Sequence, residues 1–465
     1  MPSKKGPMPI IGLKQKNITH LNLWMYLCAM STSTKSQAEI LSKLKIASLN
    51  PMQLAAQKAI QSSNDLILLS PTGTGKTLAF LLPLIQELNE SISEIQLLII
   101  VPSRELAIQI EQVMREMGTG FKVNAVYGGR AGSKDRIEIK HRPAVLIGTP
   151  GRVADHLRRG AFETKYIKTL VLDEFDKSLE IGFELEMKNI LDLLPKIKKQ
   201  ILTSATQDVA IPKFVHLEAA IRIDFLSDKI SQLKVKRLIS PSKDKLDTLI
   251  QLISNLGNQN GIIFCNFKDS IQRVSDFLAA NGLSHGTFHG DMEQQDRERS
   301  LIKFRNGTHQ LLLATDLAAR GIDVPELGFI IHYQLPNRES EFTHRNGRTA
   351  RMNAEGTAFI LYHEKEKLPD FAMNAGLEKL NRAKLPEASE WSTLFISGGR
   401  TNKISKGDIV GLLIKQGGLK QDQLGVIELK TDCAFVAVKT KQIANLLPKV
   451  NSVKLKEKKV RVTLV

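Results

Sequence analysis

Short apolar runs alternate with longer amphipathic stretches between about residues 35 and 226. Five of these runs have the length and composition of strands buried on both faces: 66–69, 97–101, 144–147, 170–172 and 200–203. The segments between them are long enough for the crossover helices that parallel strands need. The pattern therefore predicts a parallel α/β sheet.

The same rhythm returns further along the chain. Apolar runs at 261–265, 309–315 and 329–332 predict the central strands of a second parallel sheet. The polar and basic stretch 227–245, which contains Pro241, predicts a linker between the two sheets. A second boundary is expected near 384–389, where a Leu-Pro-Glu-Ala segment interrupts the pattern.

The C-terminal part predicts a smaller module of a different kind. It alternates expected strands and helices in the order β-α-β-β-α-β, which is typical of a small α+β sandwich: strands at 394–396, 425–427, 434–438 and 460–462, and helices at 408–416 and 441–447. Phe395 and Phe435 stand on expected strands. We expect these two rings to be interior side chains and not an exposed aromatic platform.

Length and composition fit several packed domains. At about 150 residues per domain, 465 residues predict two or three domains, and 42% hydrophobic and 24% charged residues allow packed cores. We expect an N-terminal extension at 1–29 that is disordered or precedes the true start at Met30, followed by domains at 30–226, 227–384 and 390–465. The sequence contains no run of eighteen apolar residues, so no membrane-spanning helix is expected.

The three cysteines argue against two kinds of covalent or metal framework. Cys28, Cys265 and Cys433 lie far apart and form no Cys-x-x-Cys pair, so neither disulfides nor a structural zinc site is expected. This usage is typical of a reducing compartment, and we expect the cytoplasm.

The net charge is +17 and is unevenly distributed. Residues 391–465 contain 14 basic and 5 acidic residues, a net charge of +9. A basic module on a nearly balanced body suggests a polyanionic partner, although a solvated lysine-rich surface would give the same count.

The most specific local motif is Ser-Pro-Thr-Gly-Thr-Gly-Lys-Thr at 70–77, between an expected strand and an apolar helix. Glycines allow the backbone to wrap a phosphate, and amides at the helix start face the anion. Lys76 can reach the outer phosphates and the Thr77 hydroxyl can bind Mg²⁺. The general phosphate-loop pattern begins with Gly, where this chain has Ser70.

About one hundred residues later, the run 170–172 ends in Asp173 and Glu174. A carboxylate at this strand end can hold Mg²⁺ through water, and its neighbour can orient and deprotonate an attacking water. Alone, such a pair is more often a surface feature. Downstream of a phosphate loop in the same sheet, it predicts a nucleotide-hydrolysing site.

The chain at this point resembles the DEAD-box family of ATP-dependent RNA helicases. Motifs similar to those of the family occur in order across residues 45–360: 50–53, 70–77, 102–107, 128–129, 149–152, 173–176, 204–206, 289–297, 314–316, 319–323 and 344–351. The resemblance implies two tandem RecA-like parallel-sheet domains, followed here by a small α+β domain similar to an RNA-recognition module. It also implies ATP and Mg²⁺ as cofactors.

The resemblance assigns roles residue by residue at the nucleotide. Nucleotide-binding residues would be Gln53, Thr72, Gly73, Thr74, Gly75, Lys76, Thr77 and Asp323, with Gln53 reading adenine and Asp323 holding the ribose. Catalytic residues would be Lys76, Asp173, Glu174, Arg348 and Arg351, with both arginines reaching the γ-phosphate. Mg²⁺ would be held by Thr77 and Asp173, mainly through water.

The resemblance also assigns RNA-binding and coupling residues. RNA-backbone contacts would come from Pro102, Arg104, Gly129, Thr149, Arg152, Gln294, Arg297 and Thr315. Ser204, Thr206 and His344 would couple hydrolysis to unwinding. Since the ATP site is divided between two domains, hydrolysis requires closure, which RNA favours. This mechanism implies local, non-processive unwinding.

Three positions depart from the family pattern. Phe175 replaces a small Ala, and we expect its ring to be tolerated near the loop that follows Ser204. Ser36 stands where an aromatic residue usually packs on adenine. Asn346 replaces a usually apolar residue, and the sequence offers no account of it.

The tail from Trp391 resembles the RNA-binding domain of the DbpA-type bacterial helicases in its size, its position, the helix start at 406–410 and the strand at 424–427. That resemblance implies large-subunit ribosomal RNA and pre-ribosomal particles as partners of a monomer, with Arg400, Lys403 and Lys406 as candidate tail contacts. Two alternatives remain open: a general helicase in messenger RNA decay or cold-shock remodelling, and a non-catalytic RNA clamp.

Overall fold

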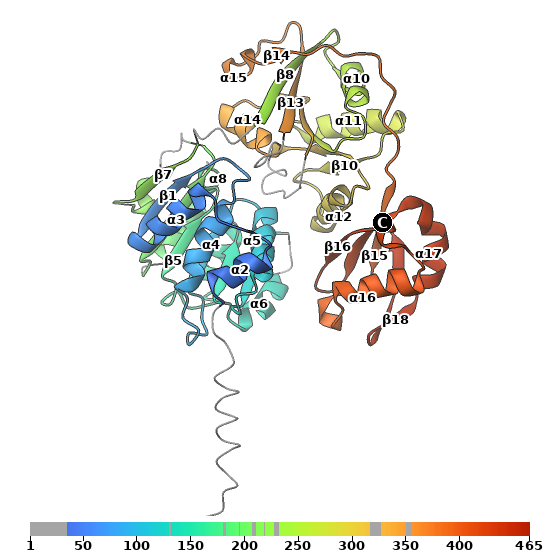
Figure 1. The fold of residues 1–465 in the computed structure, drawn as a ribbon. Coiled ribbons are helices and arrows are strands. Elements are labelled where there is room, and N and C mark those ends of the chain that lie inside the picture. Colours follow the sequence, from blue (N-terminus) through green and yellow to red (C-terminus); the bar gives the residue numbers. More distant parts are fainter. Residues whose placement is uncertain are drawn as a thin grey trace, which may run out of the picture.

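A computed structural model describes most of the chain. The described residues are 35–129, 132–179, 183–194, 196–206, 211–217, 219–226, 232–316, 327–349 and 355–465. They form three units, two of which contain a central sheet covered by helices, with the smaller C-terminal unit beside the second (Figure 1). The expected extension at 1–29 lies outside the described residues.

The first sheet is entirely parallel, in the order β3-β4-β2-β5-β6-β1-β7. Its strands are β1 (Asp65–Leu69), β2 (Leu97–Ile100), β3 (Val123–Val126), β4 (Val145–Gly148), β5 (Thr169–Leu172), β6 (Lys199–Ser204) and β7 (Ile221–Asp224). Its helices are α2 (Gln37–Lys43), α3 (Pro51–Ser62), α4 (Lys76–Gln86), α5 (Arg104–Met117), α6 (Gly132–Lys140), α7 (Pro150–Arg158), α8 (Phe175–Ser178), α9 (Glu184–Asp192) and η1 (Lys213–Val215).

The second sheet repeats this topology, in the order β10-β11-β9-β12-β13-β8-β14 and again parallel. Its strands are β8 (Gln232–Ser240), β9 (Gly261–Phe264), β10 (His285–Phe288), β11 (Leu311–Ala314), β12 (Phe329–His332), β13 (Glu355–His363) and β14 (Gly376–Leu377). Its helices are α10 (Leu246–Leu256), α11 (Lys268–Ala280), α12 (Gln294–Arg305), α14 (Glu339–Asn346) and α15 (Asp370–Met373).

Burial on both faces explains why the central strands are continuous apolar runs. In β2, Leu97 and Ile99 enter the core on one face of the sheet, while Leu98 and Ile100 enter the core on the other. Successive side chains of a strand point to opposite faces, so a strand covered on both sides needs apolar residues at every position. The predicted parallel sheets are thus confirmed.

The prediction of a linker at 227–245 is wrong for residues 232–240. Residues 232–240 form β8, which pairs with β13 along nine positions inside the second sheet. Its basic side chains gave the segment the composition of a linker. The second expected boundary agrees better with the structure, because residues 378–389 contain no helix or strand.

The C-terminal unit is an antiparallel sheet in the order β16-β17-β15-β20, with helices on one face. Its elements are β15 (Trp391–Ile396), η2 (Arg400–Asn402), α16 (Lys406–Gly411), the π-helix η3 (Leu412–Gln416), η4 (Gln421–Gln423), β16 (Leu424–Leu429), β17 (Ala434–Lys439), η5 (Thr440–Gln442), α17 (Ile443–Val450), β18 (Val453–Leu455), β19 (Lys458–Val460) and β20 (Val462–Leu464). The prediction of a single strand at 460–462 is wrong. Strand β19 ends at Val460, and a separate strand, β20, begins at Val462.

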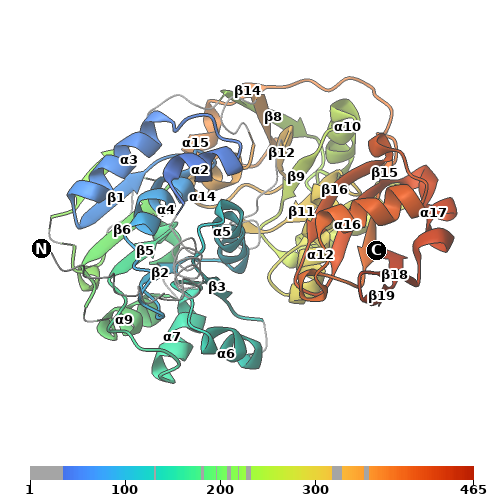
Figure 2. The ribbon, with the colours of Figure 1, turned by 60° about the horizontal axis from the view of Figure 1, so that its bottom comes forward.

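The other face of this small sheet lies against α12 of the second unit (Figure 2). Arg305 donates to both carboxylate oxygens of Glu428, at 2.7 and 2.9 Å, and the Thr308 hydroxyl lies 2.7 Å from that of Thr393. Phe395 and Phe435 lie on this face, with ring centroids 5.5 Å apart. Phe435 is buried as predicted, whereas Phe395 is only half-buried, and neither belongs to the tail's own core.

In the described part of the chain, no helix combines the length and apolar character needed to cross a membrane.

Candidate nucleotide and RNA site

The loop between β1 and α4 has the geometry that the phosphate-loop motif predicts. Gly73 and Gly75 adopt φ of 82° and 86°, the left-handed region that favours glycine. The Lys76 amine is buried and donates to the carbonyl oxygens of Ser70 and Pro71 at 2.6 and 2.9 Å. Burial lowers the pKa of Lys76, while the charges of Asp173 and Glu174 oppose that shift. A buried amine between a loop of this kind and two carboxylates suits a phosphate.

Helix α3 braces this loop from the side. Asn50 caps the helix, and its amide donates to the Thr74 carbonyl at 2.9 Å. Gln53 donates to the Gly75 carbonyl at 3.2 Å, which places the expected adenine reader directly against the phosphate loop. Ser36 caps α2 together with Glu39, so this departure from the family pattern supplies a helix cap in place of an aromatic ring.

The two carboxylates follow β5 and are buried. Asp173 accepts hydrogen bonds from the Thr203 hydroxyl and from the Glu174 amide. Burial and the neighbouring Glu174 charge raise the pKa of Asp173 to about 6. Since a divalent cation would relieve both effects, the pair suits Mg²⁺.

The protein would supply few ligands to such a cation. Among the described residues, no three His, Cys, Asp or Glu side chains are grouped to hold a metal. Mg²⁺ commonly takes one or two protein ligands and completes its shell with water and substrate phosphates. Asp173 and the half-buried Thr77 at the start of α4 fit that mode.

Replacement of Asp173 by Asn should stabilise the nucleotide-free protein and abolish ATP turnover. With a folded-state pKa near 6 against an ordinary 3.8, the ionised group destabilises the folded state by about 3 kcal/mol above pH 6. The gain should therefore shrink as pH falls from 6 towards 4 and vanish below the ordinary pKa. Unfolding in urea at pH 8, 6 and 4 measures it. A gain equal at all three pH values would contradict the assignment.

The Phe175 side chain lies in the apolar core of the first unit. Its ring is 2% exposed and joins the apolar core behind the first sheet, so the larger side chain is accommodated as expected. The next residue, Asp176, accepts from the Ser204 hydroxyl at 2.9 Å. Ser204 also accepts from the Thr206 amide at 3.0 Å, which ties the two predicted coupling residues together.

Helix α14 and the turn that follows it bring side chains of the second unit to this cluster. His344 Nε2 lies 2.9 Å from Asp176 Oδ2, and Arg348 Nη2 lies 3.7 Å from Glu174 Oε1. Burial acts to raise the pKa of Asp176, but the bonds from His344 and Ser204 outweigh it and hold that pKa below its ordinary value. The structure thus has its two units closed over the phosphate loop. Arg351 and Asp323 lie outside the described residues.

A second set of contacts crosses between the units at the predicted RNA motifs. Arg297 Nη2 lies 2.9 Å from Glu105 Oε1, with both side chains buried, and Arg104 donates to Gln294 at 3.2 Å. The Arg104 guanidinium also packs on Gly129, whose φ is 78° and where a Cβ would stand only 2.3 Å from Nη1. Arg104, Gln294 and Arg297 therefore hold the two units together in addition to any RNA contact.

The remaining predicted RNA residues lie at strand ends of the same two sheets. Pro102 is buried between β2 and α5, and the half-buried Thr149 directly precedes α7. Arg152 pairs with the buried Asp135 at 3.2 Å and donates to the Tyr127 carbonyl. Thr315 follows β11 and is half-buried.

The tail candidates Arg400, Lys403 and Lys406 are exposed at one end of the small sheet. Residues 399–406 lie beside the turn at 430–433, where Arg400 N donates to the Lys430 carbonyl at 3.1 Å. Lys458 from the β18–β19 hairpin donates to Asn402 at 3.3 Å, which adds another cation to this end. The charges of Glu111, Arg115 and Glu116 on α5 act on Arg400, so this end of the tail faces the first unit.

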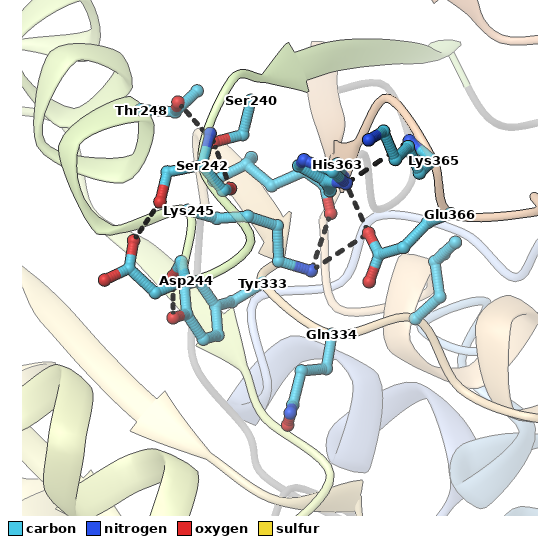
Figure 3. Close-up of polar contacts among 12 residues, drawn as sticks. Ser240, Ser242, Asp244, Lys245, Thr248, Tyr333, Gln334, His363, Lys365 and Glu366 are labelled. Carbon is cyan, nitrogen blue, oxygen red and sulfur yellow. Dashed lines mark hydrogen bonds and ion pairs between the residues drawn. The ribbon is translucent and has the colours of Figure 1, made fainter.

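The second sheet has an equivalent edge that lacks a phosphate loop. A cavity of about 770 Å³ opens there, and Lys245 precedes α10 much as Lys76 begins α4. Lys245 donates to the Leu361 carbonyl at 3.2 Å and lies 3.5 Å from the Glu366 carboxylate (Figure 3). Residues 241–245 contain no glycine, and the Leu246 amide is taken by Asp244. Lys245 therefore links this loop to β13.

Three residues that take part in the site were missed in the sequence. Glu105 and Asp176 lie inside the motifs at 102–107 and 173–176, but their partners come from the other unit. Thr203 directly precedes the motif at 204–206 and holds Asp173. An acidic residue within a motif was the available signal for the first two, and nothing in the sequence marked the third.

Three family models match successive parts of the chain. The model for DEAD/DEAH box helicases matches residues 50–213, the helicase conserved C-terminal domain matches 244–353, and the DbpA RNA binding domain matches 393–464. Relatives include the ATP-dependent RNA helicases DbpA of Escherichia coli (strain K12) and Bacillus subtilis (strain 168). The first is 32% identical over 92% of this chain and 97% of the relative, the second 29% identical over 88% and 93%.

Solved structures of similar fold contain RNA and nucleotide analogues. One is S. cerevisiae Dbp5 bound to RNA and ADP BeF3, with 28% identity, a TM-score of 0.64 and coverage of 71% of this chain and 88% of that one. Another is the DEAD-box helicase Mss116 bound to ssRNA and UDP-BeF, with 26% identity, a TM-score of 0.68 and coverage of 77% and 80%.

Proposed function

The chain belongs to the DEAD-box family of ATP-dependent RNA helicases, is of the DbpA type, and on this premise we propose that it remodels large-subunit ribosomal RNA by local, non-processive unwinding. The observation that supports the coupling most strongly is the double closure between the two units. One set of contacts, Glu174 with Arg348, lies at the ATP site, and the other, Glu105 with Arg297, lies among the RNA motifs. Both sets join the same two units, so a single closing movement would make both.

At the nucleotide, we assign phosphate binding to the loop Thr72 to Gly75 together with Lys76, and adenine recognition to Gln53. Thr77 and Asp173 would hold Mg²⁺, which supplies charge neutralisation at the β- and γ-phosphates when bound. Gly347 of the second unit packs so closely on Thr72 that a Cβ there would clash with its hydroxyl. Closure therefore shields the phosphates from water.

For hydrolysis, we assign the base to Glu174. Its carboxylate would take a proton from the attacking water while the new oxygen–phosphorus bond forms and the bond to ADP breaks. Arg348 would stabilise the charge on the γ-phosphoryl oxygens, with Arg351 as its expected companion and Asp323 on the ribose. Because Arg348 comes from the second unit, the open enzyme lacks this stabilisation.

Coupling would run through Asp176, which joins Ser204 to His344 across the junction. RNA would lie along Pro102, Arg104, Gly129, Thr149 and Arg152 of the first unit. Gln294, Arg297 and Thr315 would contact it from the second. Phosphate and 2′-hydroxyl contacts carry little sequence information, so this surface alone would not select an RNA.

Selectivity would come from the tail. Since α12 covers the sheet face that carries Phe395 and Phe435, we place RNA at the basic end formed by Arg400, Lys403 and Lys406. A structured ribosomal hairpin held there would be presented to α5, which begins at Arg104. Pre-ribosomal particles in the cytoplasm would be the natural source of such RNA.

A comparison of three RNAs tests this assignment. Steady-state ATPase rates would be measured with poly(A), transfer RNA and a large-subunit ribosomal fragment at equal nucleotide concentration. We expect selective stimulation by the ribosomal fragment. Changing Arg400, Lys403 and Lys406 together to Gln should remove the selectivity, while the control that changes the exposed Lys415, Lys420 and Lys449 to Gln removes the same charge and should keep it.

Each other outcome points to a different function. Equal stimulation by all three RNAs would favour a general helicase, whose tail is only an anchor. RNA binding without stimulated turnover would favour the non-catalytic clamp.

A further inference from the structure

Asn346, the departure without an explanation in the sequence, forms a buried hydrogen bond with His332. Asn346 is the last residue of α14, and His332 is the last residue of β12, beneath that helix. His332 Nε2 lies 2.9 Å from Asn346 Oδ1, and the two residues are 0% and 8% exposed. We propose that this pair fixes the C-terminal end of α14 and thereby positions Arg348 for ATP hydrolysis.

The surroundings of the pair are buried and largely aromatic. The His332 ring stacks on Phe342 of α14, with centroids 4.6 Å apart, and lies 6.2 Å from Phe264 of β9. Burial and the nearby Arg345 charge lower the pKa of His332 to about 3, so the imidazole is neutral at ordinary pH. Since an amide oxygen only accepts, the Nε2–H group donates to it. The amide is thus the polar partner that the buried ring needs at this point.

The position of the pair in the helix makes it relevant to catalysis. The chain leaves α14 at Asn346 and reaches Arg348 two residues later. The Asn346 carbonyl accepts from the Thr349 amide at 3.1 Å, so both the side chain and the backbone of Asn346 define this exit. The last turn of a helix frays easily unless its residues are held by tertiary contacts. The bond to β12 supplies such a contact.

Other residues hold the last turn of the helix on its other sides. Arg345 donates to Asp316 at 2.5 and 2.6 Å, and to the Gln334 carbonyl at 2.6 Å. His344 reaches Asp176 in the first unit. These contacts hold the residues before Asn346, and the Thr349 hydroxyl donates to the Leu327 carbonyl just after Arg348. Asn346 is the residue of the last turn whose side chain is bonded to β12, so it holds the chain where it leaves the helix towards Arg348. His332 and Asn346 act through Arg348 and are therefore positioning residues.

The bond also predicts a compensating pattern of substitutions. Asn346→Ile leaves the buried imidazole without its acceptor, and His332→Leu leaves the amide without its donor. A buried polar group without a partner is costly, whereas replacing both partners by apolar groups can be nearly neutral. The double substitution should therefore repair what either single one damages.

The test measures kcat and KM for ATP at saturating RNA. We expect Asn346→Ile and His332→Leu each to lower kcat roughly tenfold, with KM for ATP nearly unchanged, and the double variant to recover most of the loss. Asn346→Ser, which shortens the side chain and removes little volume, should act in the same direction and folds more safely. The matched control is Thr248→Val, which removes a buried bond to Ser240 in the same unit, far from α14 along the chain.

Two results would overturn the proposal. The first is a kcat that falls no further than in Thr248→Val although thermal unfolding shows similar destabilisation. The second is an Asn346→Ser variant with unchanged kcat. The inference rests on the proposed role of Arg348, so Arg348→Ala is measured too. If it leaves hydrolysis intact, the role of Arg348 is wrong. If it abolishes hydrolysis while the Asn346 variants do not affect kcat, only the pair assignment fails.

Discussion

Replacement of Glu174 by Gln should lower RNA-stimulated ATP turnover roughly 10³-fold, the range that a positioned general base contributes. Glutamine keeps the size of the side chain but cannot accept a proton from water. Glu174 is 6% exposed, and its Oε1 lies 3.7 Å from Arg348 Nη2, the arginine assigned to the γ-phosphate.

ATP and RNA binding should survive this substitution. The phosphate loop is braced by Asn50 and Gln53, not by Glu174. Removing the Glu174 charge also relieves the repulsion that helps to raise the pKa of Asp173. We therefore expect ATP-dependent RNA binding at least as tight as in the parent protein, measured by fluorescence anisotropy with a labelled RNA.

The control for this variant is Glu163→Gln, an exposed residue paired only with Lys165 at the surface. It should leave turnover unchanged, since surface ion pairs contribute little. If Glu174→Gln still hydrolysed ATP at a rate near that of Glu163→Gln, another group would have to be the base.

The architecture and the parts of the site within each unit could be predicted from the sequence. Strands buried on both faces must be apolar throughout, so β2, β4, β5 and β9 were visible as runs. Parallel strands end at the same edge of a sheet, so motifs placed directly after such runs had to come together. The phosphate loop and Asp173 are brought together for that reason.

Contacts between units could not be predicted in the same way. Glu105 and Arg297 are 192 positions apart, and each motif alone looks like a surface for RNA phosphates. Only the docking of two folded sheets shows that their charges face each other. The strand β8 was missed because its own sequence is polar and basic. It becomes a strand by pairing with β13, which lies more than one hundred residues later.

The tail was predictable as a fold but not in its placement. Its alternating strands and helices follow from local patterns, whereas the use of one sheet face for docking depends on α12. The bond between Arg305 and Glu428 joins residues 123 positions apart. Thr393 and Thr308 are ordinary polar residues whose contact no local pattern marks.

Charge reversal of Arg297 or Glu105 should abolish RNA-stimulated turnover, and exchange of the two charges should restore much of it. Breaking a buried ion pair costs about 3–5 kcal/mol, which corresponds to a loss of roughly one hundredfold to several thousandfold in the closed, active population. Arg297→Glu places two carboxylates together, and Glu105→Arg places two guanidinium groups together. The double variant Glu105→Arg, Arg297→Glu recreates an opposite-charge pair in the same buried space.

The kinetic pattern separates closure from RNA contact. If the pair holds the units together, both single variants keep ATP binding to the first unit, lose stimulated turnover, and are rescued at least tenfold by the exchange. If Arg297 acted only on an RNA phosphate, the double variant would stay as inactive as Arg297→Glu, because the guanidinium introduced by Glu105→Arg would lie on the other unit. The exposed Arg273→Glu, in the same unit as Arg297, provides the control and should remain active, since its ion pair with Asp244 lies in solvent.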